Sequence, residues 1–271
     1  MLVGLSIDIL SVGFKYKRAD RNSQQSINVQ NNGTKEKHET SFNLNTYTIS
    51  QKCKQILDIF KKHPSLIQYV ILVIIFGILT AFHWSFYFWF IEEIRGKDTL
   101  LFGLCILVQS FIGELPFFFI SDKIVRYYGF AISLNICLLV FAARYFAYGY
   151  LLSKSDTYWD VLLVELCQGP NFGLYYTVMI SLAHYYADKS CHLNRRTENI
   201  DEKIQNKAIH ATMQGIMSGC YEGLGIGIGS LIGGILIEKL GVFKFWRCAS
   251  FFAFGSLICN IIIDVVKYIL T

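Results

Sequence analysis

A few ionisable residues stand inside long apolar runs of this sequence, and their chemistry needs an explanation. Glu114, Arg144, Glu165 and Glu222 each lie within such a run. A charged side chain in the middle of a bilayer costs several kcal/mol, so it faces the interior of a helical bundle or a watery cavity and is a candidate for function. These residues therefore predict a polar path through an apolar protein.

The depths of these residues decide which of them can meet. At about 1.5 Å rise per residue, Arg144 and Glu165 lie at similar depths, roughly 9–12 Å from the outer ends of their apolar segments. We expect them to be partners, either as a structural ion pair or in a coupling role. Glu114 stands nearer to the cytoplasmic side and should not contact Arg144 directly.

Two further polar residues complete the candidate path. Glu222 lies near the middle of its segment, where an unpaired and desolvated carboxylate would be able to carry a proton. Gln168 follows Glu165 by three residues and therefore shares its helix face. The sequence QGPN at 168–171 predicts a break in that helix, either as a simple proline kink or as the wall of a cavity.

Long apolar segments must carry these residues. The 271-residue chain is 53% hydrophobic and 15% aromatic, and six segments approach the ~20 apolar residues that cross a bilayer. We predict an all-α membrane protein in which residues 64–271 form a bundle of six transmembrane helices. Residues 1–63 are expected to form a flexible polar segment with a short basic amphipathic piece. The predicted spans are 65–91, 100–121, 130–152, 159–186, 208–241 and 246–270.

Charge and cysteine patterns narrow the class of protein. Basic residues are concentrated on the loops that share a side with the N-terminus, which predicts that both termini are cytoplasmic. Arg247 falls on the outer side and must pair or reach the interface, while His83 and Asp264 are expected near the outer and inner interfaces. The eight cysteines are scattered, so we expect no disulfide framework, no zinc site and no cofactor. No basic patch indicates nucleic acid.

Closely spaced glycines mark the fifth predicted span. Gly225, Gly229 and Gly233 recur every four residues, a spacing typical of helices that pack closely in a membrane. Glycines would weaken a helix in water by about 1 kcal/mol each relative to alanine. We therefore predict that this face packs against another helix of the bundle.

The loop SDKIVRYYG at 121–129 resembles the cytoplasmic hairpin motif of the major facilitator superfamily. Asp122, Lys123 and Arg126 match its charged positions, and Val125 stands in place of its second glycine. Three longer segments resemble the last six helices of a branch akin to major facilitator superfamily domain-containing protein six, itself similar to sugar and nucleoside proton symporters. These segments are GELPFFFISDKIVRYYG, ELCQGPNFGLYY and MQGIMSGCYEGLGIGIGSLIGG.

This resemblance implies helices seven to twelve of a twelve-helix transporter, with a gating role for Asp122, Lys123 and Arg126. In lactose-permease-like members, charged residues on helices eight, nine and ten couple protons to sugar. The corresponding helices of this chain carry Glu114, Arg144 and Glu165. Leu162 occupies the position of the helix-ten histidine of those members, so the same proton relay is not expected.

We therefore predict the C-terminal half of a secondary transporter that moves a small polar solute by alternating access, with proton coupling left open. The expected partners are the lipid bilayer, the solute and a six-helix N-terminal half or a second copy of the chain. A receptor or scaffold without transport is the alternative. An enzyme is not expected, because no nucleophile, metal cluster or His/Asp constellation shares one depth. The expected solute or proton path comprises Glu114, Arg144, Glu165, Gln168 and Glu222.

Overall fold

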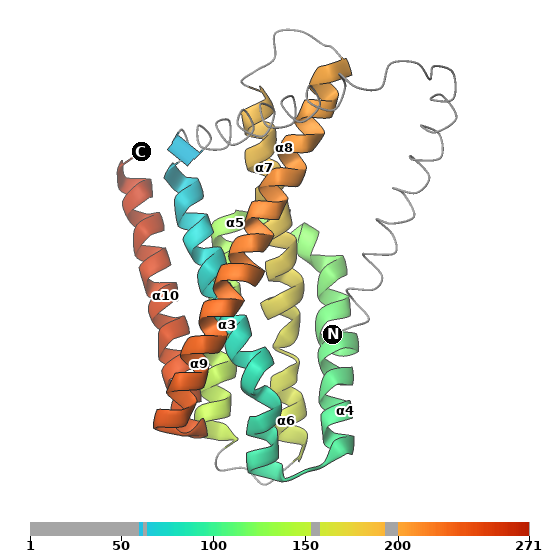
Figure 1. Cartoon of the computed structure of the whole chain (residues 1–271), viewed down its shortest axis with the longest axis vertical. Coiled ribbons are helices and arrows are strands. Elements are labelled where there is room, and N and C mark those ends of the chain that lie inside the picture. Colours follow the sequence, from blue (N-terminus) through green and yellow to red (C-terminus); the bar gives the residue numbers. More distant parts are fainter. Residues whose placement is uncertain (1–59, 62–63, 153–157, 193–199, 271) are drawn as a thin grey trace, which may run out of the picture. The chain divides into compact units, whose positions relative to one another are not determined.

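Helices account for every element of the described chain (Figure 1). The computed structural model describes residues 60–61, 64–152, 158–192 and 200–270, which belong to the unit Ile56–Thr271. Within these ranges no strand occurs. The all-α class is therefore confirmed for the described part of the chain. The predicted polar segment at 1–63 lies outside it, except for Phe60 and Lys61.

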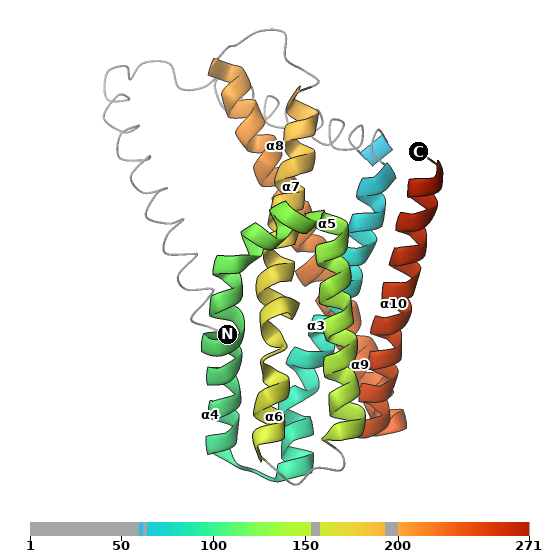
Figure 2. The same ribbon diagram turned by 180° about the vertical axis from the view of Figure 1, so that it is seen from behind.

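Successive crossings of the bundle alternate in direction, and several labelled elements can form one crossing, as α6, η3 and α7 do (Figures 1 and 2). Several contain a π-helical stretch, labelled η, in which the backbone hydrogen bonds join residues i and i+5 instead of i and i+4. The elements are α3 (Pro64–Arg95), α4 (Thr99–Leu107), η1 (Val108–Glu114), α5 (Leu115–Phe146), η2 (Ala147–Leu151), α6 (Tyr158–Glu165), η3 (Gly169–Leu174), α7 (Tyr175–His192), α8 (Ile200–Ser218), η4 (Gly219–Ile226), α9 (Gly227–Leu240) and α10 (Val242–Leu270).

Four helical stretches in the described residues have the length and composition to cross a membrane: Pro64–Arg95, Thr99–Leu151, Ile209–Leu240 and Val242–Leu270. The second contains Gly129, whose φ of 77° and ψ of 175° turn the chain back on itself (Figure 2). The predicted spans 100–121 and 130–152 are therefore two antiparallel helices. The predicted span 159–186 is divided by a turn at 166–167. The chain is a multi-pass membrane protein.

Glycine and a capping carboxylate form the short connections. Gly96, with φ of 76°, follows α3 and takes a backbone conformation that glycine adopts most readily. The Asp98 Oδ1 atom then accepts hydrogen bonds from the Leu100 and Leu101 amides at 3.0 and 3.2 Å, which caps the start of α4. Gly241, with φ of 77°, ends α9 in the same way that Gly96 ends α3.

The outer surface of the bundle is apolar, as expected for helices surrounded by lipid. Large hydrophobic side chains on several helices are 68–75% exposed, namely Leu100, Phe111, Phe119, Leu231 and Ile269. In water such a surface would be unfavourable over so wide an area. In a bilayer it contacts hydrocarbon, while each helix satisfies its own backbone hydrogen bonds.

The glycine series of η4 and α9 lies against α3. A Cβ atom on Gly225 would be 2.7 Å from the Gly77 Cα atom, and one on Gly229 would be 2.7 Å from the α3 backbone. A Cβ atom on Gly233 would meet an aromatic ring of α3. Gly227 lies on the other face, with nothing within 4 Å of its Cβ position. The two backbones thus approach more closely than larger residues would permit.

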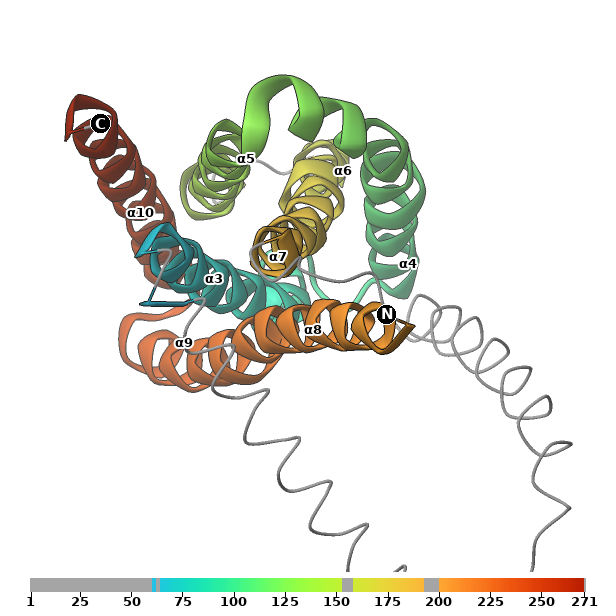
Figure 3. The same ribbon diagram turned by 90° about the horizontal axis from the view of Figure 1, so that it is seen from above.

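The segment α6–η3–α7 lies between α4 on one side and α3 and α5 on the other (Figure 3). It contacts α5 through η3 and α7, α4 through α6, and η1 through η3. Polar side chains on α6 and η3 therefore meet side chains from three neighbouring helices. This central position assembles the candidate site.

Candidate functional site

Arg144 is the centre of a buried polar cluster. It lies on α5, and its side chain is fully buried. Its Nη2 atom forms an ion pair with Glu165, and its Nη1 atom donates to the Gln168 amide oxygen. Its Nε atom donates to the Tyr148 hydroxyl at 2.8 Å. Each of the three guanidinium nitrogens therefore has an acceptor.

Glu165 balances the charge of Arg144. Its side chain is also fully buried, and its Oε1 atom accepts a hydrogen bond from the Tyr148 hydroxyl at 2.6 Å. Its Oε2 atom accepts from the Gln109 amide nitrogen as well as from Arg144. A buried ion pair persists when further hydrogen bonds satisfy its remaining polar atoms. Here both carboxylate oxygens are engaged, so the pair is electrically balanced.

Gln168 connects this ion pair to Glu114. Its amide oxygen accepts from Arg144, and its amide nitrogen donates to the Glu114 Oε1 atom at 3.0 Å. Glu114, partly buried at the end of η1, is thus linked to Arg144 through one side-chain amide. Gln168 stands directly before η3, just after the turn at 166–167. The fold therefore brings together four of the five path residues chosen from the sequence.

His83 joins the cluster from α3. Its Nε2 atom lies 3.2 Å from the Arg144 Nη2 atom and 3.4 Å from the Gln109 Nε2 atom. Both neighbours are donors, because a guanidinium cannot accept and Gln109 turns its amide nitrogen toward the Glu165 carboxylate. The His83 Nε2 atom is therefore the acceptor, so the imidazole is neutral with its proton on Nδ1. This Nδ1 atom has no partner in the described chain.

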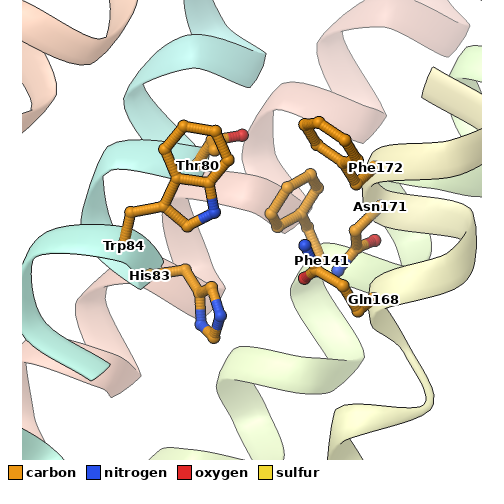
Figure 4. Close-up of a pocket in the computed structure, with 7 residues that line it drawn as sticks. All are labelled: Thr80, His83, Trp84, Phe141, Gln168, Asn171 and Phe172. Atoms are coloured by element: carbon orange, nitrogen blue, oxygen red, sulfur yellow. The ribbon is translucent and has the colours of Figure 1, made fainter. Parts of the chain in front are cut away.

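A small pocket lies beside the cluster (Figure 4). Its lining side chains stand close together: the unfilled space of about 180 Å³ includes open solvent, and no cavity that would hold a water-sized molecule is enclosed. A solute could enter only if the lining side chains moved apart. On each of two helices the lining residues follow an i, i+3, i+4 spacing and so share one face. The walls are Thr80, His83 and Trp84 from α3, Gln168, Asn171 and Phe172 at η3, and Phe141 from α5.

Asn171 is a buried amide of this pocket with unmet hydrogen-bonding capacity. It is only 2% exposed, yet neither its Oδ1 nor its Nδ2 atom has a partner in the described chain. A buried polar group without a partner costs about 1–3 kcal/mol, and such groups call for an explanation. His83 and Asn171 lie on opposite sides of the pocket (Figure 4). Together they offer an acceptor and donors to a bound molecule.

His83 and Asn171 were not among the residues selected from the sequence. The sequence placed His83 at the outer interface, but it is 3% exposed because the face of α3 that carries it turns inward. Asn171 follows Gln168 by three residues, which is a signal that it shares the face of that residue. For His83 the comparable signal is Thr80, three residues earlier on the same helix face.

The remaining site residues chosen from the sequence lie away from this cluster. Glu222 is exposed on η4 and is not bonded to Arg144 or Glu165. Asp122 and Arg126 form an exposed ion pair at 3.0 Å, one helical turn apart on α5. Lys123 is exposed beside them. Within the described ranges, no group of three or more His, Cys, Asp or Glu residues is placed to hold a metal ion.

A second polar cluster ties α3, α5 and α10 together. Asn260, 3% exposed, accepts from Gln68 and donates to Asn135, both at 2.7 Å. Asp264 accepts from Gln68 at 2.9 Å and from Asn260 at 3.3 Å. Asp264 was expected near the inner interface, and this cluster half-buries it. Its polar contacts are internal, which favours a structural role.

Arg247, on the predicted outer side, is held by η2. Its Nε atom donates to the Gly149 carbonyl at 3.0 Å. Its guanidinium carbon lies 4.4 Å from the centre of the Tyr150 ring, within the range of a cation–π contact. The Arg247 guanidinium is therefore engaged by a backbone carbonyl and an aromatic ring at this end of the bundle.

The sequence matches a known protein family over most of its length. The model of the MFS_1 like family matches residues 1–193 and 199–248 of the chain. No solved structure matches it.

Proposed function

The chain belongs to the MFS_1 like family, related to the major facilitator superfamily, and we propose that it is the C-terminal half of a secondary transporter for a small polar solute. One observation carries this proposal: a buried, balanced ion pair, Arg144–Glu165, adjoins a pocket in which Asn171 and His83 keep unmet hydrogen-bonding atoms. Transporter sites are characteristically built where helices are broken near the middle of the membrane. The break before η3 supports this assignment.

The cluster provides a physical link between solute binding and helix movement. A solute in the pocket would contact Asn171 and the Nδ1 proton of His83, and His83 in turn touches Arg144. Glu165 ends α6 just before the turn at 166–167. A proton added to Glu165 would remove the charge that Arg144 balances and would loosen α6 from α5. Solute and proton could thereby act on the same contact, the one between α5 and α6.

Alternating access requires a second bundle, either a six-helix N-terminal half or a second copy of this chain. In this proposal residues 64–271 form the transport bundle, residues 1–63 are cytoplasmic, and both termini lie in the cytosol. Glu222, exposed on η4, would face the other bundle. Asp122, Lys123 and Arg126 would contact that bundle at the cytoplasmic gate.

Solute uptake into liposomes tests this proposal. The chain would be reconstituted alone and with an N-terminal six-helix partner, under an imposed pH gradient, with labelled sugars and nucleosides. The critical variant is Arg144→Gln with Glu165→Gln, since it removes both charges at once and leaves none unpaired. We expect uptake with the partner and loss of its pH dependence in this double variant. Uptake of no solute by any form, alongside capture of a protein ligand, would instead indicate a receptor.

A further inference from the structure

We propose that the His184–His210 pair, which joins α7 to α8, binds a divalent transition-metal ion through its two imidazoles. These helices pack against each other and lie side by side (Figures 1 and 2). The proposal does not depend on the proposed function, because it uses no residue of the Arg144 cluster. The two histidines are 26 residues apart in the sequence, so their spacing forms no metal-binding motif.

The two imidazoles have the separation of neighbouring ligands of one metal ion. The Nδ1 atoms of His184 and His210 are 3.0 Å apart. Metal–nitrogen bonds of about 2.0–2.1 Å place neighbouring ligands about 2.9 Å apart in a square-planar site and about 3.3 Å apart in a tetrahedral one. The ring centroids are 5.2 Å apart, so the rings point toward each other. The exposed His184 ring must therefore rotate for both nitrogens to share the ion.

Asp188 prepares His210 to act as a ligand. The Asp188 Oδ1 atom is 3.1 Å from the Nε2 atom of His210, and an ionised carboxylate only accepts hydrogen bonds. The Nε2 atom therefore carries a proton, and Nδ1 of the neutral ring directs its lone pair toward His184. Histidines that bind metals almost always donate their other ring N–H to a carboxylate, a carbonyl or water in this way. The negative charge of Asp188 also favours a cation.

Solvent completes the site. Because Nδ1 of His210 has no proton, Nδ1 of His184 donates the hydrogen bond between them. When an ion takes the place of this proton, the proton moves through water to Nε2 of His184, and the net number of bound protons is unchanged. The side chain of His184 is exposed, so water and the ion reach it. The described residues add no third protein ligand, and water fills the other coordination positions.

The ligand type selects the class of ion. Imidazole suits Zn²⁺, Cu²⁺ and Ni²⁺, whereas Mg²⁺ and Ca²⁺ prefer oxygen ligands. Ni²⁺ is the suitable probe, because the chain has eight cysteines and Ni²⁺ does not oxidise thiols as Cu²⁺ does. An ion held by both histidines links α7 to α8, and an ion that binds only the folded protein stabilises it. Binding should therefore raise the melting temperature.

Isothermal titration calorimetry on the full chain in lipid nanodiscs, purified without a histidine tag, tests the proposal. We expect Ni²⁺ to bind and to raise the melting temperature, and Mg²⁺ to do neither. His184→Gln and His210→Gln should each weaken the binding of Ni²⁺ by about tenfold or more, whereas His38→Gln, at a histidine outside the described ranges, should not. If Ni²⁺ does not bind, or if both substitutions leave its binding unchanged, the pair is a hydrogen bond only and the proposal fails.

A substitution that keeps both histidines tests the role of Asp188. Asp188→Asn should weaken the binding of Ni²⁺ about 10–100-fold, as the loss of a carboxylate that orients a metal-binding histidine does. The matched control is Glu92→Gln, an acid-to-amide change in another ion pair, Glu92–Lys97 at 3.2 Å, and it should leave the binding unchanged. If Asp188→Asn binds Ni²⁺ as tightly as Glu92→Gln does, Asp188 does not position His210 and the proposed site is wrong.

Discussion

The buried ion pair Arg144–Glu165 allows a quantitative test of how the bundle is held together. In Glu165→Gln, the amide would replace a carboxylate that accepts hydrogen bonds from Arg144, Gln109 and Tyr148. One of its oxygens would become an NH₂ group that faces donors. Arg144 would at the same time remain charged, with its side chain fully buried.

The expected magnitude follows from this burial. Removing one member of a buried pair costs about 3–5 kcal/mol, since it leaves an uncompensated charge. The double variant Arg144→Gln with Glu165→Gln leaves no charge, so it should lose only hydrogen bonds, about 1–2 kcal/mol in total. The double-mutant cycle should therefore give a coupling energy of at least about 2 kcal/mol.

Equilibrium unfolding in mixed micelles, followed by far-ultraviolet circular dichroism, measures these differences. The control is Asp122→Asn, because it makes the same acid-to-amide change in an ion pair whose side chains are 79% and 58% exposed. That pair should contribute only about 0–1 kcal/mol. If Glu165→Gln costs no more than Asp122→Asn, water reaches the Arg144 charge and the dry, balanced site described here is refuted.

Two further predictions concern glycines and use the same unfolding measurement. Gly225→Ala should destabilise the bundle by about 1–3 kcal/mol, since the new Cβ atom would meet the α3 backbone at 2.7 Å. Gly227→Ala, two residues away and in open space, should be neutral or stabilising by up to about 1 kcal/mol. If Gly225→Ala and Gly227→Ala changed the free energy of unfolding equally, the close packing of Gly225 would be contradicted. Gly129→Ala should destabilise the protein by about 1–3 kcal/mol, because Gly129 has a positive φ. The control Gly255→Ala, where nothing lies within 4 Å of the Cβ position, should not destabilise it. A neutral Gly129→Ala would show that the turn tolerates a side chain.

Several features of the fold could be predicted from local properties of the sequence. The spans follow from hydropathy, because a bilayer demands long uninterrupted apolar runs. The turn at Gly129 and the irregular backbone around Gly169 and Pro170 follow from residues that disfavour a continuous α-helix. The pairing of Arg144 with Glu165 follows from depth alone, since the rise per residue converts position along a span into distance across the membrane.

The composition of the candidate site could not be predicted in the same way. Asn171 and His83 line the pocket, and Gln109 bonds to Glu165. Glu222 is an intramembrane carboxylate like Glu165, yet it lies exposed on η4. Which face a helix turns inward depends on its rotation about its own axis. In a soluble protein the apolar stripe of a helix reveals that rotation.

In this protein the lipid-facing and the buried faces are both apolar, as the exposed Leu100 and the buried Leu79 illustrate. The sequence by itself therefore determined the helices, their order and the depth of each charge, because these depend only on position along the chain. Tertiary packing decided which side chains meet, because helix rotation is set by contacts between helices, such as Gly225 against Gly77, and not by hydrophobicity.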